Sequence, residues 1–539
     1  MTTHAHSSGT PVLETTVLVA GAGPAGLACA AELNHHGIEC LVVEPRETVS
    51  NLRPRAKTTS VRTMEHFRRW GVAKALREAA PIPLSWSNRV TFCTSLSGRE
   101  ITSFPGAFGL TTTRDDRFAE SSQVIPQPVV ETVLREHLLS RRSVSLELGS
   151  SVVDLDEQGD HVVATVLSKG GASRQVRARY LVGCDGANSV VRRRMGATLL
   201  GHSDPRPNFN VVFSAPRLRT HLPPAVQYWV VGAETPGLIG RLDLDGTWWS
   251  IFPGVDAAYG EKNVGRLIEN LVGRAVDHEV VAIDPWTARM LISDRFQTDR
   301  VFLVGEAAHL NPPWGGHGYN TSVGDAVNIG WKIAAVVHGW GGEALLASYE
   351  AERRPAVTRT VAIAEQNMGT LAGDLDNVAE AIQQAKRPEF HSLGLVLGYS
   401  YGGSPVVQGG PAQDDPDIST YVPSTSPGAR LPHVWLPDGT SLYDALGRGM
   451  TLVGPLTDQR GDQVAALVER AAEAGVPLRL LEAPQGRPWG DELLLVRPDQ
   501  HIAWSGQRLD ELDLELVIGQ NEPLPPTNSS RSKESVDVG

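Results

Sequence analysis

The chain has 539 residues, which corresponds to about three to four folding units at roughly 150 residues each. Its net charge of −12, from 49 Lys+Arg and 61 Asp+Glu, argues against nucleic acid or an anionic membrane surface as the main partner, since both attract clustered basic residues. Its four cysteines form no C-x-x-C pair, which argues against a disulfide scaffold and a cysteine-rich zinc site. The N-terminus lacks the basic region of a secretory signal, and no apolar run reaches the ~18 residues of a membrane span. We therefore expect a cytoplasmic protein without a metal centre.

The N-terminal segments predict a βαβ unit. Thr16–Ala20 and Ile38–Val43 are short apolar runs typical of buried parallel strands, and Leu27–His36 predicts a helix between them. The turn before this helix fits the pattern G-x-G-x-x-G, in which glycines let a pyrophosphate approach the N–H groups of a helix N-terminus. An acid, Glu44, ends the second strand, near the offset at which a carboxylate accepts hydrogen bonds from a ribose. Dinucleotide contacts are therefore expected at Gly21, Gly23, Pro24, Ala25, Gly26 and Glu44, and the motif alone allows either NAD or FAD.

The rest of the chain alternates between predicted strands, helices and turn-rich stretches. The predicted segments are, in order, a polar excursion over Glu100–Ser122, a helix over Val129–Ser140, a hairpin over Ser150–Val166, a strand at Tyr180–Gly183, an aromatic sheet layer over Pro205–Pro285, a strand at Val301–Gly305, a helix over Val323–Val337, a linker over Gln408–Pro427, an α/β domain over Leu431–Ile518 and a disordered tail from Pro523.

Further motifs follow the glycine turn in a fixed order. They are Asp185-Gly186-Ala187-Asn188-Ser189 leading to Arg192, Gly305-Glu306-Ala307-Ala308-His309, Pro312-Pro313-Trp314-Gly315-Gly316-His317-Gly318-Tyr319-Asn320-Thr321, and Tyr349-Glu350-Ala351-Glu352-Arg353-Arg354-Pro355. They resemble the D-G-x-x-S-x-x-R, G-D-A-A-H, P-P-x-G-G-x-G-x-N and Y-x-x-E-R-R-P motifs of flavoprotein hydroxylases. The chain is thus similar to the single-component FAD-dependent aromatic hydroxylases of the para-hydroxybenzoate hydroxylase type. Within them it most resembles the phenol and dichlorophenol hydroxylases and the tailoring enzymes of aromatic polyketides.

The resemblance implies an α/β fold with three parts. A Rossmann-like FAD-binding domain is expected, with an interleaved, mostly antiparallel substrate sheet and a thioredoxin-like C-terminal domain. The implied boundaries are 12–200 for the first part of the FAD-binding domain, with an excursion at about 85–125 into the substrate layer, 201–290 for the substrate sheet, 291–407 for the second part of the FAD-binding domain, 408–427 for the linker, 428–520 for the thioredoxin-like domain and 521–539 for the disordered tail.

The resemblance also implies site residues. Catalytic roles are expected for Pro313, Arg55 and His317, where His317 either adds positive charge beside the flavin or is a solvated loop histidine. Glu306 stands where the family usually has Asp, which puts the strength of FAD binding in question rather than the identity of the cofactor. The further cofactor contacts expected are Arg55, Gln127, Asp185, Gly186, Gly305, Glu306, Pro313, Gly316, Gly318, Tyr319 and Asn320.

Aromatic side chains in the middle layer are expected to be mostly core, with two or three lining a substrate pocket. The candidates for the pocket are Tyr228, Trp229, Trp248, Phe252 and Trp314.

The function implied is an FAD-dependent monooxygenase that hydroxylates a phenolic or other electron-rich aromatic ring. NADPH or NADH would reduce the flavin transiently, O2 would add at flavin C4a, and the resulting hydroperoxide would attack the ring. A Baeyer–Villiger or epoxidising oxygenase acting on a polyketide-like substrate would share these motifs. A plain NAD-dependent dehydrogenase or a non-catalytic dinucleotide binder would need only the first glycine turn, and the later motifs argue against both. The expected partner is a small aromatic molecule, and the sequence leaves the substrate base and the oligomeric state open.

Overall fold

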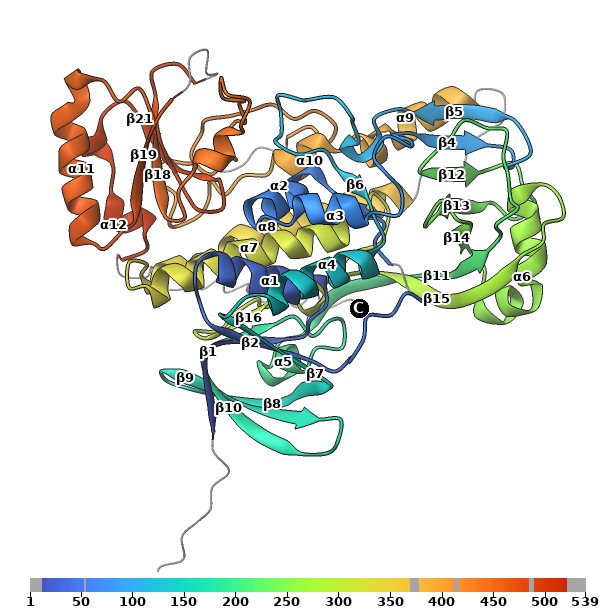
Figure 1. Cartoon of the computed structure of the whole chain (residues 1–539), viewed down its shortest axis with the longest axis horizontal. Coiled ribbons are helices and arrows are strands. Elements are labelled where there is room, and N and C mark those ends of the chain that lie inside the picture. The colour runs from blue at the N-terminus through green and yellow to red at the C-terminus, as the bar shows by residue number, and fades with distance from the viewer. Residues whose placement is uncertain (1–11, 53–54, 369–377, 412–415, 484–488, 521–539) are drawn as a thin grey trace, which may run out of the picture.

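The computed structural model describes residues 12–52, 55–368, 378–411, 416–483 and 489–520. The predicted disordered tail, 521–539, lies outside the described residues. Within the described part the chain has a mixed α/β fold built around an N-terminal sheet, a large sheet and a C-terminal sheet. Figure 1 shows the large sheet and the C-terminal sheet at opposite ends of the molecule, with the N-terminal sheet and long helices between them.

The N-terminal sheet contains the predicted βαβ unit. Its strand order is β7-β2-β1-β10-β9-β8, and β16 pairs with β10. The strands from β7 to β10, together with β16, run parallel, whereas β8 and β9 form the predicted antiparallel hairpin. The bounds are β1 (Leu13–Ala20), β2 (Cys40–Glu44), β7 (Val144–Leu148), β8 (Ser150–Gln158), β9 (His161–Ser168), β10 (Ser173–Gly183) and β16 (Val301–Leu303).

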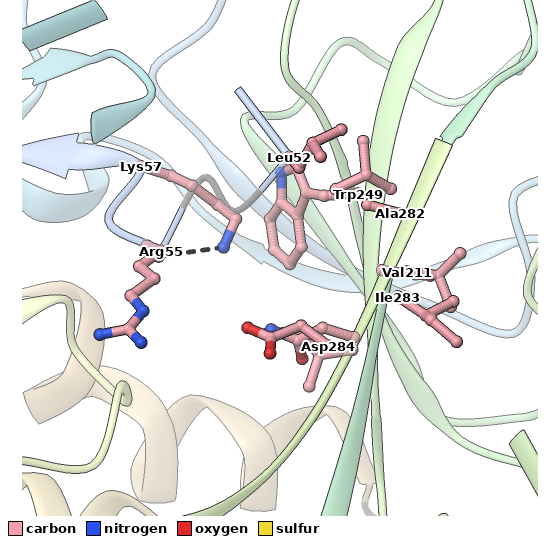
Figure 2. A pocket seen from close by; sticks show the side chains of 12 residues that line it. Leu52, Arg55, Lys57, Val211, Trp249, Ala282, Ile283 and Asp284 are labelled. Atoms are coloured by element: carbon pink, nitrogen blue, oxygen red, sulfur yellow. Dashed lines mark hydrogen bonds between the residues drawn. The ribbon is translucent and has the colours of Figure 1, made fainter. Parts of the chain in front are cut away.

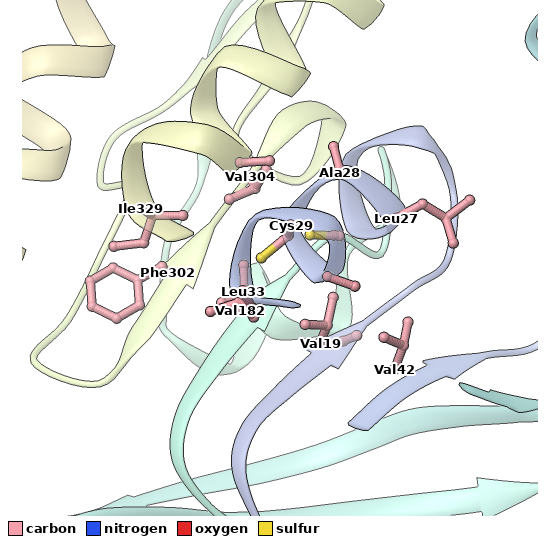
Figure 3. Packing of buried hydrophobic residues seen from close by; sticks show 14 of the residues in the cluster. Val19, Leu27, Ala28, Cys29, Leu33, Val42, Val182, Phe302, Val304 and Ile329 are labelled. Atoms are coloured by element: carbon pink, nitrogen blue, oxygen red, sulfur yellow. The ribbon is translucent and has the colours of Figure 1, made fainter. Parts of the chain in front are cut away.

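Helix α1 (Pro24–His35) lies between this sheet and helix α7 (His317–Val337). Figure 3 shows Leu27, Cys29 and Leu33 of α1 packed among side chains from both neighbours. The two helices cross closely, because a Cβ at Gly330 of α7 would lie only 2.6 Å from Cγ of Glu32. Helix α1 is therefore buried along nearly its whole length, which holds its N-terminus rigidly at the glycine turn.

Helix α7 begins at His317, earlier than the predicted Val323. The two residues before it, Gly315 and Gly316, have φ values of 84° and 70°, which glycine adopts at low cost. The loop therefore turns directly into the helix, and the motif residues Gly318 to Thr321 form its first turns, in agreement with the helix N-terminus expected at these residues. The remaining helices of this region are α2 (Val61–Arg69), α3 (Ala73–Ala79), α4 (Gln127–Leu139), α5 (Val190–Arg194) and α8 (Glu343–Met368).

The large sheet has the strand order β17-β15-β11-β14-β13-β12-β4-β5 and is antiparallel except where β12 runs parallel to β4. Strands β4 and β5 come from the segment predicted to leave the first domain. Helix α6 (Ala257–Val272) covers one face, and helix α9 (Val378–Phe390) packs against β5. The bounds are β4 (Val90–Cys93), β5 (Glu100–Phe104), β11 (Leu199–Ser214), β12 (Gln227–Val230), β13 (Gly237–Arg241), β14 (Thr247–Pro253), β15 (Glu279–Ser293) and β17 (His309–Leu310).

The C-terminal sheet has the strand order β19-β18-β20-β21. Strands β18 and β19 are parallel, and β20 runs antiparallel to both of its neighbours. The bounds are β18 (Met450–Gly454), β19 (Leu478–Glu482), β20 (Leu493–Val496), β21 (Ile502–Gly506), α11 (Gly461–Glu473) and α12 (Leu514–Val517).

A buried charge cluster joins the C-terminal region to α7 and α8, and we call it the junction. At its centre, Glu352 of α8 accepts hydrogen bonds from Lys332 Nζ at 2.7 Å, Asn328 Nδ2 at 2.6 Å and Arg497 Nη1 at 2.7 Å. Arg497 also pairs with Asp499 at 2.6 Å. Burial raises the pKa of Glu352, but Arg497 and Lys332 outweigh burial and hold that pKa well below its ordinary value. The C-terminal region is thus fixed to the rest of the chain through charges that water does not reach.

No helix among the described residues has the length and apolar character needed to cross a bilayer. In the same part of the chain, no group of three or more His, Cys, Asp or Glu residues is arranged to hold a metal ion.

Candidate functional site

The glycine turn between β1 and α1 is closely packed on one side and open on the other. A Cβ at Gly21 would lie 2.5 Å from the carbonyl oxygen of Cys184, and one at Gly26 would lie 1.9 Å from that of Gly21. At Gly23, by contrast, no heavy atom lies within 4 Å of such a Cβ. Gly23 is also the N-cap of α1 and provides no side chain to the free N–H groups there. The open side therefore gives an anion access to a helix N-terminus.

Glu44 lies beside this turn at the end of β2. It is almost fully buried, and its Oε2 accepts a hydrogen bond of 2.7 Å from the backbone N–H of Ala22. Its Oε1 accepts one of 2.6 Å from Arg46 Nε, and Arg46 pairs in turn with Glu131 of α4 at 3.2 Å. These contacts hold the Glu44 carboxylate in one orientation at the glycine turn, as a ribose contact requires.

The predicted Asp185 and Gly186 form the turn between β10 and α5. The carboxylate of Asp185 accepts hydrogen bonds from Ser189 Oγ at 2.5 Å and from the backbone N–H of Val190 at 2.6 Å, so it caps α5. Gly186 has a φ of 76° and open space where a Cβ would stand. Arg192 donates to the carbonyl oxygen of Ala307 at 2.9 Å and thereby links this motif to the one after β16. Sequence reasoning identified this motif but not the capping role of its carboxylate.

Glu306 and Arg55 meet at the edge of the molecule between β16 and the segment before β3 (Thr58–Thr59). The distance from Arg55 Nη1 to Glu306 Oε2 is 3.3 Å, and the side chains are 56% and 47% exposed. Gly305, with a φ of 64°, makes the turn that presents Glu306. Residues 251 positions apart are thus brought together, both of them predicted cofactor contacts. We call this ion pair the cofactor edge.

A buried triad supports the same turn from behind. Asp325 of α7 accepts hydrogen bonds from His309 Nε2 and from Arg353 Nε, each at 2.8 Å, and from the backbone N–H of Gly305 at 3.2 Å. Burial raises the pKa of Asp325, but Arg353 and His309 outweigh burial and keep that pKa below its ordinary value. The strand-end motif and the helix-end motif are therefore connected through one ionised carboxylate of α7. The motifs included Gly305, His309 and Arg353 without indicating that these residues meet at Asp325.

His317 is the first residue of α7 and is buried. Its Nε2 has no hydrogen-bond partner among the described residues. Burial lowers the pKa of His317 to about 4, so its imidazole is neutral near pH 7. The side chain is therefore not a solvated loop histidine, and the lowered pKa disfavours the positive charge that the other reading expects. Positive potential at this end of α7 comes from the free backbone N–H groups.

Asn320 and Gln127 brace the loops around the cofactor edge. Asn320 Oδ1 accepts from the backbone N–H of Ser60 at 2.9 Å, and its Nδ2 donates to the carbonyl oxygens of Thr58 at 3.1 Å and Gly316 at 2.8 Å. The backbone N–H of Gln127 donates to the carbonyl oxygen of Ala56 at 2.9 Å. The side-chain amide of Asn320 is thus occupied by protein partners. The other predicted loop residues, Pro313, Gly318 and Tyr319, lie in or next to the start of α7.

A narrow pocket, with a cavity volume of about 30 Å³, lies between the cofactor edge and the large sheet. Figure 2 shows Arg55 and Lys57 on one side of it, with Trp249 and Asp284 facing them, while Val211 and Ile283 point away. Its polar lining residues are Arg55, Lys57, Asn210, Ser250 and Asp284.

Three of the predicted pocket residues lie on the other face of the sheet. Tyr228, Trp248 and Phe252 are buried in the cluster beneath α6 and do not line this pocket. Side chains alternate along a strand, and this alternation places Trp229 and Trp249 on the opposite face. Trp229 is there packed against Phe92, with ring centroids 5.3 Å apart, while Trp249 lines the pocket.

Trp314, the last predicted pocket residue, lies in the loop before α7. It is partly buried and packs against Trp286 at a centroid distance of 5.9 Å. Sequence reasoning missed Lys57, Asn210 and Asp284, whereas Trp249 belongs to the aromatic layer from which two or three pocket residues were expected. The alternation within Thr247–Pro253 distinguishes Trp248 from Trp249, but only the position of α6 decides which of them faces the pocket.

The chain offers the elements that bind FAD at two helix N-termini. An open glycine turn precedes α1, a fixed carboxylate ends β2, and a second glycine-rich loop precedes α7, beside the substrate pocket. The unpartnered Nε2 of the buried His317 adds a polar atom at the second of these places. These features together define an FAD-binding oxidoreductase.

The comparisons with known proteins extend this class to a family. Residues 14–364 match the FAD binding domain family, and residues 424–519 match the aromatic-ring hydroxylase C-terminal family. The chain is 30% identical to the 2,4-dichlorophenol 6-monooxygenase of Delftia acidovorans, over 93% of this chain and 96% of that protein. The chain belongs to the FAD-dependent aromatic-ring hydroxylase family and is a flavoprotein monooxygenase.

Solved structures agree with this assignment. The fold is similar to that of RebC soaked with chromopyrrolic acid and containing 7-carboxy-K252c, with 32% identity, a TM-score of 0.84, and coverage of 94% of this chain and 100% of that chain. It is also similar to aklavinone-11 hydroxylase in a ternary complex with FAD and aklavinone, with 27% identity, a TM-score of 0.80, and coverage of 95% and 100%.

Proposed function

We propose that this monooxygenase hydroxylates a phenolic or other electron-rich aromatic ring, with NADPH or NADH as the transient reductant and O2 as co-substrate. The observation that carries the proposal is that the pocket and the cofactor edge share Arg55, which lines the pocket and pairs with Glu306. A substrate in that pocket lies between the aromatic wall at Trp249 and the edge of the cofactor site. The relative from Delftia acidovorans is named for a dichlorophenol, which supports an aromatic substrate of this type.

The chain's own groups bind and orient, while bound FAD supplies the redox chemistry that uses the reductant to activate O2. The open glycine turn and the N-terminus of α1 bind the pyrophosphate, and Glu44 accepts hydrogen bonds from the ribose. The free N–H groups at the start of α7 stabilise negative charge on the ring system through the helix dipole. Neutral His317 adds a polar contact without adding charge. The apolar wall around Trp249 excludes water from the reacting ring.

We assign the site residues on this basis. Catalytic positions are Pro313, Arg55 and His317, and the cofactor contacts are Gly21, Gly23, Pro24, Ala25, Gly26, Glu44, Arg55, Gln127, Asp185, Gly186, Gly305, Glu306, Pro313, Gly316, Gly318, Tyr319 and Asn320. For Asp185, Gln127 and Asn320 we propose support of the cofactor loops through backbone geometry, because each of these side chains is held by protein partners.

We also propose a thioredoxin-like fold for the C-terminal domain, 428–520. Its βαβ unit followed by two antiparallel strands, in the order β19-β18-β20-β21, supports that proposal. The division into 12–200, 201–290 and 291–407 follows the alternation between the N-terminal sheet and the large sheet. The acidic net charge and four free, buried cysteines support a small-molecule partner, no nucleic acid and a cytoplasmic location.

The test is oxygen incorporation by the purified, FAD-loaded enzyme. An absorbance band at about 450 nm, which is typical of flavins, establishes the cofactor. Phenols and structurally matched ketones are then incubated with NADPH or NADH under ¹⁸O₂. We expect a phenol that gains one ¹⁸O atom at a ring carbon. A ketone converted to an ¹⁸O-ester, with no phenol oxygenated, would contradict the proposal.

A second measurement examines coupling between substrate and reductant. Without O2, NADPH should bleach the absorbance near roughly 450 nm at least about tenfold faster with the phenol present. The glycine-rich loop at Gly315 and Gly316 provides backbone freedom for a substrate-dependent rearrangement. Equal bleaching rates with and without the phenol would leave oxygen insertion standing but remove substrate control of reduction.

A further inference from the structure

The substrate pocket contains a lysine that the motifs do not account for. Lys57 immediately precedes β3, and its backbone is held where the carbonyl oxygen accepts a hydrogen bond of 2.9 Å from the N–H of Ile125. Its Nζ lies 4.5 Å from the centre of the Trp249 ring and donates to the carbonyl oxygen of Arg55 at 3.2 Å. Both the ammonium group and the aromatic ring line the same pocket, as Figure 2 shows.

The second feature of Lys57 concerns its carboxylate neighbours among the described residues. Within the described residues, no Asp or Glu forms an ion pair with its Nζ, in contrast to Arg55, which pairs with Glu306. The other charged groups at the pocket are Arg55 from the same segment and Asp284 from β15. Burial lowers the pKa of Lys57 to about 8, which agrees with a cation that lacks a compensating partner. A partly buried cation without a carboxylate partner favours an anionic ligand, because the ligand restores interactions lost with water.

An aromatic wall lies directly beside this cation. An aromatic ring that packs against Trp249 would bring an oxygen substituent on its rim within reach of Nζ, since Nζ already lies over that indole. Asn210 of β11 provides a further polar group in the pocket, although its Oδ1 accepts a hydrogen bond of 2.8 Å from Trp286. The pocket therefore combines an aromatic surface with one available cation.

We propose that Lys57 binds the acidic oxygen of the aromatic substrate and stabilises it as the phenolate. This inference rests on the proposed function and adds the residue that anchors the substrate oxygen. The phenol O–H bond breaks with its electron pair left on oxygen. Its proton passes to Nζ when Lys57 is uncharged and to water when Lys57 is already an ammonium group. The product of either route is an ammonium–phenolate pair, whose ring is richer in electrons and so reacts more readily with an electrophilic oxygen.

The experiment uses the FAD-loaded enzyme and 4-nitrophenol, whose anion absorbs visible light, with 4-nitroanisole as the probe that has no acidic proton. Binding is measured by equilibrium dialysis, and ionisation of the bound probe by difference spectra across pH. We expect the wild-type enzyme to bind the phenol more tightly than the anisole. Binding should also raise the acid ionisation constant of the phenol about tenfold, which lowers the pKa of the phenol by about one unit. Lys57→Met should abolish both effects, and Lys57→Arg should retain them, because it keeps the charge.

Lys74→Met is the matched control, because Lys74 is 88% exposed on α3 and is not among the residues that line the pocket. It should ionise the probe like the wild-type enzyme. Unchanged ionisation in Lys57→Met, or no preference of the wild-type enzyme for the phenol, would overturn the inference. So would a Lys57→Met variant whose only defect is a higher KM for NADPH. Failure of the hydroxylase proposal is seen separately, as absence of ¹⁸O in any aromatic product of the wild-type enzyme.

Discussion

The cofactor edge and the junction both consist of ion pairs that join distant parts of the chain, yet they differ in their access to water. Arg55 and Glu306 at the cofactor edge are about half exposed and 3.3 Å apart. At the junction, Glu352 and Arg497 are fully buried and 2.7 Å apart. An exposed pair contributes about 0–1 kcal/mol, whereas breaking a buried pair costs about 3–5 kcal/mol. The pair that costs little to separate lies where a ligand must enter, and the pair that costs much lies where two domains must stay together.

The same contrast applies to how many partners each charge has. Glu352 accepts hydrogen bonds from Lys332, Asn328, Arg497 and Ser404, which leaves its oxygens no capacity for a ligand. Lys57, near the cofactor edge, donates to one backbone carbonyl oxygen. Charges that are fully satisfied by protein therefore maintain the fold here, and those that are only partly satisfied are the candidates for binding substrate or cofactor.

The largest effect is expected at the junction. Arg497→Met should lower the free energy of unfolding by about 3–5 kcal/mol, because it leaves the carboxylates of Glu352 and Asp499 buried with fewer partners. Urea unfolding of the FAD-loaded enzyme measures the change. Arg508→Met, which removes an exposed pair with Asp510, should change stability by less than about 1 kcal/mol. Equal effects of the two substitutions would remove the distinction between the junction and an ordinary surface pair.

A smaller effect, dependent on pH, is expected at the start of α7. The pKa of His317 is about 4 in the folded chain, below the value of about 6.5 for an unfolded histidine. Between these values the unfolded state binds a proton that the folded state does not, so folding stability falls as pH decreases from about 6.5 to about 4. The loss is complete below about pH 4 and amounts to about 3 kcal/mol.

His317→Gln should remove that contribution, because glutamine does not titrate. The measurement is the difference in unfolding free energy between wild type and variant at several pH values, in which the other buried histidines cancel. The variant should gain relative to the wild-type enzyme as pH falls from about 6.5 to about 4. Parallel stability curves would mean that the folded chain leaves the pKa of His317 at its unfolded value, which would contradict the prediction.

At the cofactor edge we expect a still smaller effect on stability, together with a measurable effect on FAD retention or flavin reduction. Arg55→Ala should change the free energy of unfolding by less than about 1 kcal/mol, since the pair with Glu306 is exposed. It should also speed FAD loss or slow bleaching of the flavin by NADPH by at least about tenfold. FAD release is followed by fluorescence and bleaching by stopped-flow absorbance. Wild-type rates of both FAD release and flavin bleaching would show that Arg55 does not act at the cofactor site.

The last prediction is that the C-terminal domain has no disulfide-reductase activity. The C-terminal domain contains no cysteine from Leu431 onward, so no dithiol can form there. In an insulin-reduction assay with dithiothreitol as electron donor, the enzyme should match a protein-free blank. Reduction above the blank would show a redox function in a domain whose visible role is the junction.

The local pattern of residues was sufficient for the N-terminal βαβ unit and its glycine turn. Apolar runs, glycine positions and the acid after the second strand all act within about 30 residues, where backbone preference and periodicity decide the structure. The same local chemistry predicted the β8–β9 hairpin and the later motif turns. It missed the start of α7 at His317, because left-handed Gly315 and Gly316 end the loop sooner than the apolar pattern suggests.

What the sequence determined by itself is the cofactor class, because FAD binding depends on short motifs whose glycines and acids act through neighbouring backbone. Only the tertiary structure decided that Trp249, and not Trp248, faces the pocket, since that depends on which face of the sheet α6 covers. Burial, which no local pattern shows, decided that His317 is neutral. The approach of Lys57 to Trp249 joins residues far apart in the chain, so the pocket cation could be found only once the sheet and the cofactor loops were in place.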